Sequence, residues 1–116
     1  MKYEIDFYKT ESGTCPLNEF FESLDNKMRT KTLRMVMLLE EYGNDLREPY
    51  SKPLGDEIFE LRVQQGNNIT RVLYFFMIGK KIVLTNGFVK KTQKTPKNEI
   101  EKAKRYRQDY LTRKEY

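Results

Sequence analysis

The chain has 116 residues, a formal net charge of +5 at pH 7, one cysteine and no histidine. This length predicts a single domain over residues 1–116, and the lone cysteine excludes an intramolecular disulfide framework. The absence of histidine argues against a transition-metal site, and no run of eighteen apolar residues is present, so we expect a cytoplasmic protein with no metal, cofactor or membrane span.

The first elements are a short strand and a helix. Apolar residues alternate with acidic ones from Tyr3 to Phe7, the period-two pattern of a half-buried strand. Pro16 suits the first position of a helix, and the apolar residues that follow recur at helical spacing as far as Leu24.

A second helix is predicted directly after the first. Asp25 offers its N-cap, and Gly43 stops it after about Tyr42. Residues 44–56 contain two prolines and a glycine and are interpreted as a connecting loop. One apolar stripe of this helix is expected to face the core: Met28, Met35, Leu38, Leu39 and Tyr42.

The second half predicts three strands and a last helix. The strands cover Glu57–Val63, Ile69–Met77 and Lys81–Val89, and the short glycine-containing spacers between them favour an antiparallel meander. Thr95 is expected to cap the last helix, with Pro96 at its first position. The order β-α-α-β-β-β-α indicates an α+β fold in which helices pack on a small, mostly antiparallel sheet.

Charge is distributed unevenly along the chain. Residues 1–56 contain eight Lys or Arg and eleven Asp or Glu, whereas residues 57–116 contain fourteen and six. A basic half joined to an acidic half suggests one surface for nucleic acid and another for a different partner.

Arginines stand inside two of the predicted strands. Arg62 shares a strand face with Glu60, and hairpin pairing would bring it close to Arg71 on the next strand. The third strand ends by delivering Lys90, Lys91 and Lys94 to the same region. The cations converge on a phosphate-binding site, or the arginines pair internally with Glu57 or Glu60.

Clustered cations without metal ligands suit cleavage of RNA through its own 2′-hydroxyl. That reaction needs a base, an acid and cations that stabilise the charged phosphorane. Arg62 and Arg71 fit the electrostatic role, because guanidinium binds phosphate in a bidentate manner and stays charged. A lysine whose pKa is lowered by neighbouring cations would serve as the base, with Tyr74 and Glu60 as weaker alternatives.

Three segments resemble the HigB branch of the RelE-superfamily toxins. They are Glu57–Arg62, Thr70–Phe76 and the lysine-rich run Gly87–Pro96, and the likeness covers about residues 50–112. The resemblance implies that the chain has a RelE-like fold and that it acts as the toxin of a type II toxin–antitoxin system. Such toxins are endoribonucleases, and many cut mRNA in the ribosomal A site.

The resemblance also implies roles for residues and partners. Arg62 and Arg71 would bind phosphate, and Lys90, Lys91 and Lys94 would lie near the scissile bond. The expected partners are a HigA-like helix-turn-helix antitoxin, the ribosome and mRNA, with operator DNA bound only through the antitoxin. The basic residues of the last helix are expected to bind RNA or the ribosome: Lys97, Lys102, Lys104 and Arg105.

Asn86 departs from the family pattern, because many relatives have histidine there. Some RelE-like toxins use a C-terminal tyrosine, for which Tyr106, Tyr110 and Tyr116 are candidates. A non-catalytic RNA-binding or regulatory module on the same fold is the alternative function. A DNA-binding accessory role is disfavoured, since no helix-turn-helix pattern is present.

Overall fold

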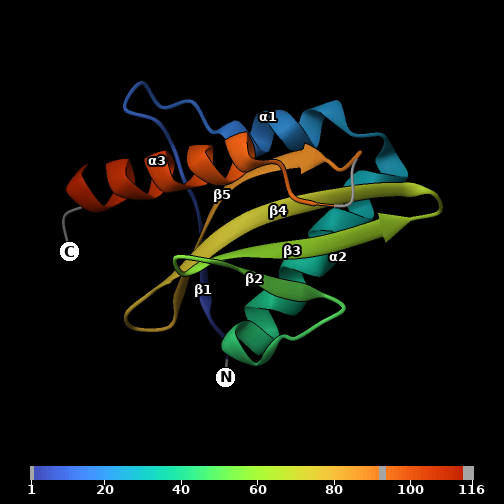
Figure 1. Cartoon of the computed structure of the whole chain (residues 1–116), viewed down its shortest axis with the longest axis horizontal. Coiled ribbons are helices and arrows are strands. Elements are labelled where there is room, and N and C mark those ends of the chain that lie inside the picture. Colours follow the sequence, from blue (N-terminus) through green and yellow to red (C-terminus); the bar gives the residue numbers. More distant parts are fainter. Residues whose placement is uncertain (1, 92–93, 114–116) are drawn as a thin grey trace.

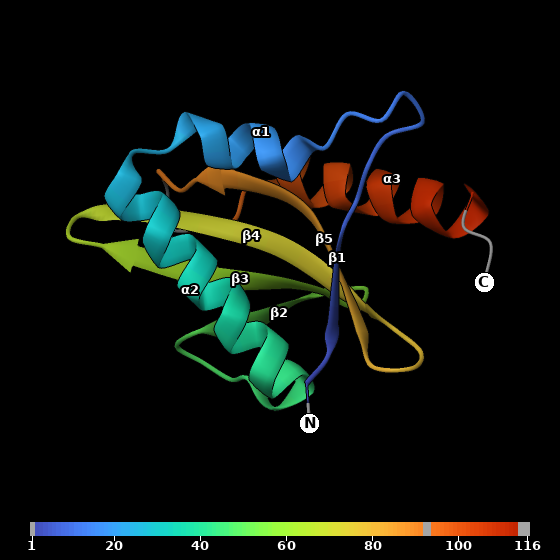
Figure 2. The ribbon, with the colours of Figure 1, turned by 180° about the vertical axis from the view of Figure 1, so that it is seen from behind.

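Two helices cover one face of a five-stranded sheet and a third helix lies on the other face (Figure 1, Figure 2). The structure, a computed structural model, describes residues 2–91 and 94–113. Its elements are β1 (Glu4–Phe7), α1 (Pro16–Ser23), α2 (Asn26–Tyr42), the 3-10 turn η1 (Gly43–Asp45), β2 (Ser51–Gly55), β3 (Ile58–Gln65), β4 (Asn68–Met77), β5 (Lys81–Val89) and α3 (Lys97–Arg113). No helix among the described residues is both long and apolar enough to cross a membrane.

The strands are ordered β1-β5-β4-β3-β2, with β1 parallel to β5 and every other pair antiparallel. The α+β class, the mostly antiparallel sheet and the β3-β4-β5 meander are therefore confirmed. In the β3–β4 hairpin Arg62 stands directly opposite Arg71, as the short spacer between the two strands predicted. Both arginines therefore lie on the same face of the sheet.

The predicted loop at residues 44–56 is wrong in part, because it contains the edge strand β2. This strand pairs with β3 from Ser51 opposite Leu61 to Gly55 opposite Ile58. The prolines and the glycine of this segment favoured a loop, yet an edge strand tolerates Pro53 because one of its sides makes no ladder hydrogen bonds. The sheet consequently has five strands, one more than predicted.

Helix ends follow the sequence signals in α1 and α2 but not in α3. The Asp25 carboxylate accepts a hydrogen bond from the Met28 N–H at 2.8 Å, and Gly43 ends α2 with a φ of +49°. Tyr42, predicted to face the core, is 51% exposed. Pro96 precedes the first helical residue of α3, and the Thr95 hydroxyl donates to Glu60 rather than capping the helix.

The sheet separates two apolar cores. Leu61, Val63 and Tyr74 pack with α1 and α2 on one face, while Ile58 and Leu73 pack with α3 on the other. This split follows from the alternation along β3 and β4, because odd and even positions of a strand point to opposite faces. Glu60, Arg62 and Arg71 fall on the α3 face.

Polar contacts hold α3 against the sheet at both of its ends. The Asn86 side chain donates to the Glu99 carboxylate at 3.0 Å in the first turn of α3. Near the other end, the Tyr110 hydroxyl donates to Asp6 of β1 at 2.8 Å. The first contact fixes the start of α3, and with it the loop before the helix, against β5.

Gly87 allows α1 to approach β5 closely. A Cβ atom at this position would overlap the ring of Phe20 in α1. The glycine that opens the lysine-rich segment is thus required by packing, because any side chain would displace α1 or its aromatic ring.

We expect Gly87→Ala to lower the free energy of unfolding by about 1–3 kcal/mol, because the added methyl group overpacks the α1 interface. The free energy of unfolding is measured by chemical denaturation for four proteins: the parent, Phe20→Ala, Gly87→Ala and the double variant. Removing the ring should relieve the clash, so the double variant should be more stable than the sum of the two single losses indicates. Additive losses would contradict the steric explanation.

Candidate functional site

A carboxylate and two guanidinium groups meet on the α3 face of the sheet. The Glu60 side chain is almost fully buried, and its Oε2 lies 3.0 Å from Arg62 Nε and 3.6 Å from Arg71 Nε. Its Oε1 accepts a hydrogen bond from the Thr95 hydroxyl of the loop before α3. The arginines therefore do pair internally with Glu60, one of the two acids considered. The other, Glu57, is exposed in the β2–β3 turn.

Arg71 is the most buried cation of this cluster, with 7% of its surface exposed. One terminal nitrogen donates to the Thr70 carbonyl at 3.1 Å, and the buried Nε has no hydrogen-bond partner among the described residues. Burial lowers the pKa of Arg71, Arg62 lowers it further, and Glu60 opposes both effects. The guanidinium stays charged at neutral pH, because its ordinary pKa is so high.

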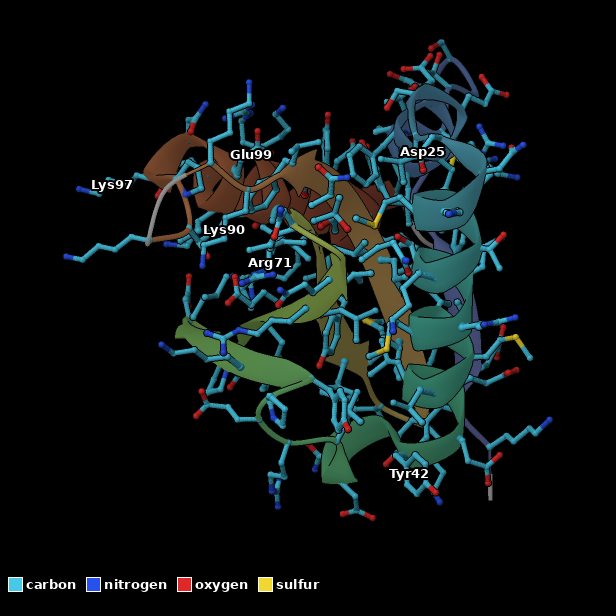
Figure 3. The ribbon with its side chains drawn as sticks, turned by 90° about the vertical axis from the view of Figure 1, so that its right-hand side faces the viewer. Asp25, Tyr42, Arg71, Lys90, Lys97 and Glu99 are labelled. Carbon is cyan, nitrogen blue, oxygen red and sulfur yellow. The ribbon has the colours of Figure 1, made fainter. Side chains whose placement is uncertain are left out.

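Lys90 lies beside this arginine pair at the end of β5 (Figure 3). Its backbone N–H donates to the Ile69 carbonyl at 2.8 Å, which keeps the chain against β4 after the strand has ended. Burial lowers the pKa of the Lys90 ammonium, and the positive charges of Arg71, Arg62 and Lys52 lower it further, against the opposing effect of Glu60. Lys90 therefore gives up its proton more readily than an ordinary lysine.

The other predicted lysines lie outside this buried cluster. Lys91 and Lys94 are exposed, and Thr92 and Gln93 between them lie outside the described residues. The structure thus brings together Arg62, Arg71 and Lys90 from the predicted set and leaves Lys91 and Lys94 at its surface.

The basic residues of α3 differ in their surroundings. Lys97 and Arg105 are exposed. Lys102 lies 3.7 Å from Glu99, and Lys104 lies 3.6 Å from Asp56, so both are partly neutralised by acids. Lys97 is the member closest in sequence to the buried cluster.

The tyrosine candidates are placed away from the cluster. Tyr74 packs in the core on the opposite face, its hydroxyl is hydrogen-bonded to Ser51, and burial raises its pKa to about 12. This geometry argues against Tyr74 as a base. Tyr106 stacks on Tyr8 and Tyr110 binds Asp6, at the end of α3 far from Lys90, and Tyr116 lies outside the described residues.

Asn86 has a structural task in this chain. It is 3% exposed, its amide nitrogen donates to Glu99, and its carbonyl oxygen accepts a hydrogen bond from the Thr85 hydroxyl at 2.7 Å. Because these hydrogen bonds occupy its side chain, Asn86 positions the start of α3 and is not available to a ligand.

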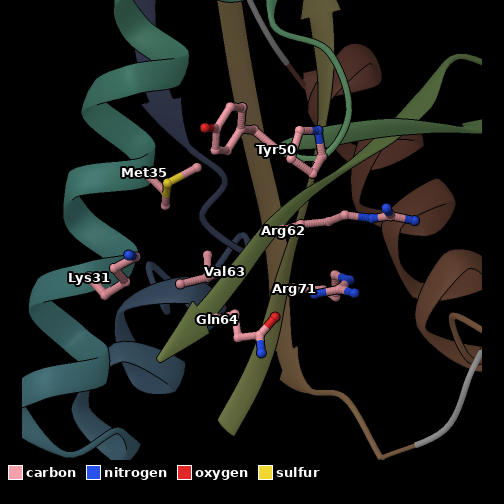
Figure 4. Close-up of a pocket in the computed structure, with 8 residues that line it drawn as sticks. Lys31, Met35, Tyr50, Arg62, Val63, Gln64 and Arg71 are labelled. Carbon is pink, nitrogen blue, oxygen red and sulfur yellow. The ribbon is translucent and has the colours of Figure 1, made fainter. Parts of the chain in front are cut away.

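A pocket of about 340 Å³ adjoins the two arginines at the free edge of β3 (Figure 4). Most of its lining could not be predicted from the sequence, because α2 and the loop before β2 reach β3 only through the tertiary fold. Its lining residues are Lys31, Met35, Pro49, Tyr50, Arg62, Val63, Gln64 and Arg71.

The cluster is suited to binding an anion. No group of three or more His, Cys, Asp or Glu side chains that could hold a metal ion occurs in the part of the chain that the structure describes. Arg62 also lies 3.4 Å from the exposed carboxylate of Glu48. Two guanidinium groups and one ammonium group still outnumber the carboxylates of Glu60 and Glu48, and a phosphate group is the natural ligand of such a set.

The chain is similar to a family of phage-derived proteins and to a protein named as a probable endoribonuclease. The family described as Phage derived protein Gp49-like (DUF891) matches residues 19–108, which include the whole cluster. The protein named "Probable endoribonuclease HigB1" in Mycobacterium tuberculosis strains CDC 1551 / Oshkosh and ATCC 25618 / H37Rv is 38% identical over 98 residues, covering 84% of this chain and 75% of the relative. The chain belongs to the family of phage-derived Gp49-like proteins.

Proposed function

We propose that this protein is the toxin of a type II toxin–antitoxin system, a HigB-type member of the RelE superfamily. In this proposal it is an endoribonuclease that cuts mRNA on the ribosome and so inhibits translation. The observation that carries the proposal is the cluster of Arg62, Arg71 and Lys90 around the buried Glu60. The likeness to a relative named as a probable endoribonuclease supports it.

The arginines supply the electrostatic part of the reaction. Arg71 is desolvated, and its buried Nε–H makes no hydrogen bond to any residue that the structure describes, so a phosphate oxygen that reaches it gains a strong, charge-assisted contact. Arg62 is more exposed and stands opposite it. Cations held in place by Glu60 need no rearrangement when negative charge develops on the phosphorane.

Lys90 is the proposed base. Its neutral amine would take the proton of the 2′-hydroxyl as that oxygen attacks the adjacent phosphorus. The bond to the 5′-oxygen then breaks, and the released oxygen takes a proton from water. The surroundings favour the neutral amine, because burial and neighbouring cations lower the pKa of Lys90.

The outer lysines extend this site toward a larger partner. Lys91, Lys94, Lys97 and Arg105 would contact mRNA or ribosomal RNA, since exposed cations bind phosphates without sequence preference. A HigA-like helix-turn-helix antitoxin is the proposed inhibitor, and operator DNA would be bound only through it.

One observation favours a second candidate, a non-catalytic RNA-binding or regulatory module. Glu60 pairs with both arginines, so their main role in this alternative is to neutralise a buried carboxylate. The exposed lysines would then bind RNA without cleavage.

Expression of the protein alone should arrest growth and translation, and co-expression of its antitoxin should restore both. Because the chain lacks histidine, positioning of the message by the ribosome should contribute much of the rate. Primer extension should therefore detect cuts on translating ribosomes and few on naked RNA. Normal growth at confirmed soluble expression would argue for the alternative module, and equal cutting of free and bound message would refute ribosome dependence.

Arg71→Gln should reduce cleavage roughly a hundredfold by removing a transition-state contact. It should also lower the melting temperature, because Glu60 loses a partner. The double variant Glu60→Gln/Arg71→Gln should regain stability but not cleavage. Arg34→Gln, an exposed arginine on α2, is the matched control and should change neither quantity. Recovery of cleavage together with stability in the double variant would make Arg71 purely structural.

The cleavage rate should rise with pH and level off above the pKa of Lys90, because the neutral amine is the active form. Since that pKa lies below the ordinary lysine value of 10.5, the plateau should begin at a correspondingly lower pH. Lys90→Arg keeps the charge but has no neutral form, so it should lose cleavage and retain RNA binding. Single-turnover rates across pH test this, with Lys27→Arg on α2 as the control. A pH-independent parent rate, or an active Lys90→Arg, would exclude Lys90 as the base.

A further inference from the structure

The pocket beside Arg62 and Arg71 exists because β2 is short. β2 pairs with β3 only as far as Leu61, and beyond it the Arg62 N–H still reaches the Tyr50 carbonyl at 2.8 Å. The outer edge of the rest of β3 has no neighbouring strand in the described chain. The pocket follows this edge, with α2 on one side and the arginines on the other (Figure 4).

Its two sides differ in chemistry. Toward α2, Met35 and Val63 are buried and apolar, and Tyr50 places a half-exposed ring beside them. Toward α3 lie the guanidinium groups of Arg62 and Arg71, which point to the same side of β3 in Figure 4. One side is therefore suited to a flat, apolar ring and the other to an anion.

Polar groups stand on both sides of the pocket. Lys31 extends from α2 on the apolar side, and Gln64 extends from β3 on the side of the arginines. The Gln64 amide nitrogen donates to the Gly66 carbonyl at 3.2 Å, which fixes the orientation of the amide. An ammonium group and an oriented amide are the kinds of group that hydrogen-bond the edge of a nucleobase.

We propose that this pocket binds one unpaired RNA base while the phosphate attached to that nucleotide lies against Arg62 and Arg71. The inference rests on the proposed function and deepens it, because it gives the site a means of choosing where it cuts. The volume of about 340 Å³ falls at the small end of ligand pockets, which suits one nucleotide and excludes a duplex. Stacking on an aromatic ring is the general way in which proteins hold single-stranded bases.

Tyr50 is the residue on which the proposal depends most. The residue is 48% exposed, so a base can reach it without displacing core residues, and its substitution should leave the fold intact. Tyr42, at the end of α2, is 51% exposed and does not line the pocket, which makes it a matched control.

The test uses short, labelled single-stranded oligonucleotides of 2′-O-methyl RNA, in which attack by the 2′-oxygen is blocked. Affinity is measured by fluorescence anisotropy for the complete ligand and for ligands with one base removed at each position in turn. In the parent protein, removal of the bound base should weaken affinity about tenfold, the loss expected for one stacked base. Removal of the other bases should have much smaller effects.

The variants decide whether the pocket is responsible. Tyr50→Ala should bind complete and abasic ligands equally, Tyr50→Phe should keep the discrimination, and Tyr42→Ala should behave as the parent. Equal affinity of the parent for all ligands, or full discrimination by Tyr50→Ala, would overturn the proposal.

Cleavage of message by the parent is measured separately, so the two proposals fail independently. A protein that discriminates the base but cuts nothing would refute the endoribonuclease and leave the base pocket standing. A protein that cuts but ignores the missing base would refute the pocket alone.

Discussion

Glu60 is buried in the sheet with 1% of its surface exposed, and a carboxylate in that position must be paired. Arg62, Arg71 and Thr95 provide the pairing from the same strand, the next strand and the loop before α3. One side chain thus links three segments and fixes two guanidinium groups on the same face. The candidate site depends on this link, because unpaired arginines would repel each other and turn toward solvent.

The same link sets the character of the site. Arg71 is held in a poorly solvated position where its charge acts strongly on nearby groups, and the fall in the pKa of Lys90 is partly its effect. A carboxylate that balances the cations keeps the cluster stable without a ligand, so phosphate must share or replace its contacts. Glu60 therefore has two effects: it holds the cations in place, and it competes with phosphate for them.

Around this centre, the fold arranges surfaces of different kinds. The exposed Lys91, Lys94 and Lys97 suit the backbone of a nucleic acid, and the pocket at the edge of β3 suits a single base. The far end of α3 is occupied by tyrosine contacts to Tyr8 and Asp6, which anchor the helix. The candidate chemistry is confined to one end of the sheet, and the other end provides rigidity.

Local patterns in the sequence determined much of this protein. Alternation placed Glu60 and Arg62 on one face of β3, the short spacer set Arg62 opposite Arg71, and Asp25 and Gly43 marked the ends of α2. These features depend on neighbours along the chain or across a tight hairpin, which periodicity and turn chemistry encode. Only the tertiary structure decided three features: the pairing of β2, the contact of Thr95 with Glu60, and the pocket that Lys31 and Tyr50 help to line. They join segments far apart in sequence, and which of those segments meet is set by the packing of helices on the two faces of the sheet, which no local pattern specifies.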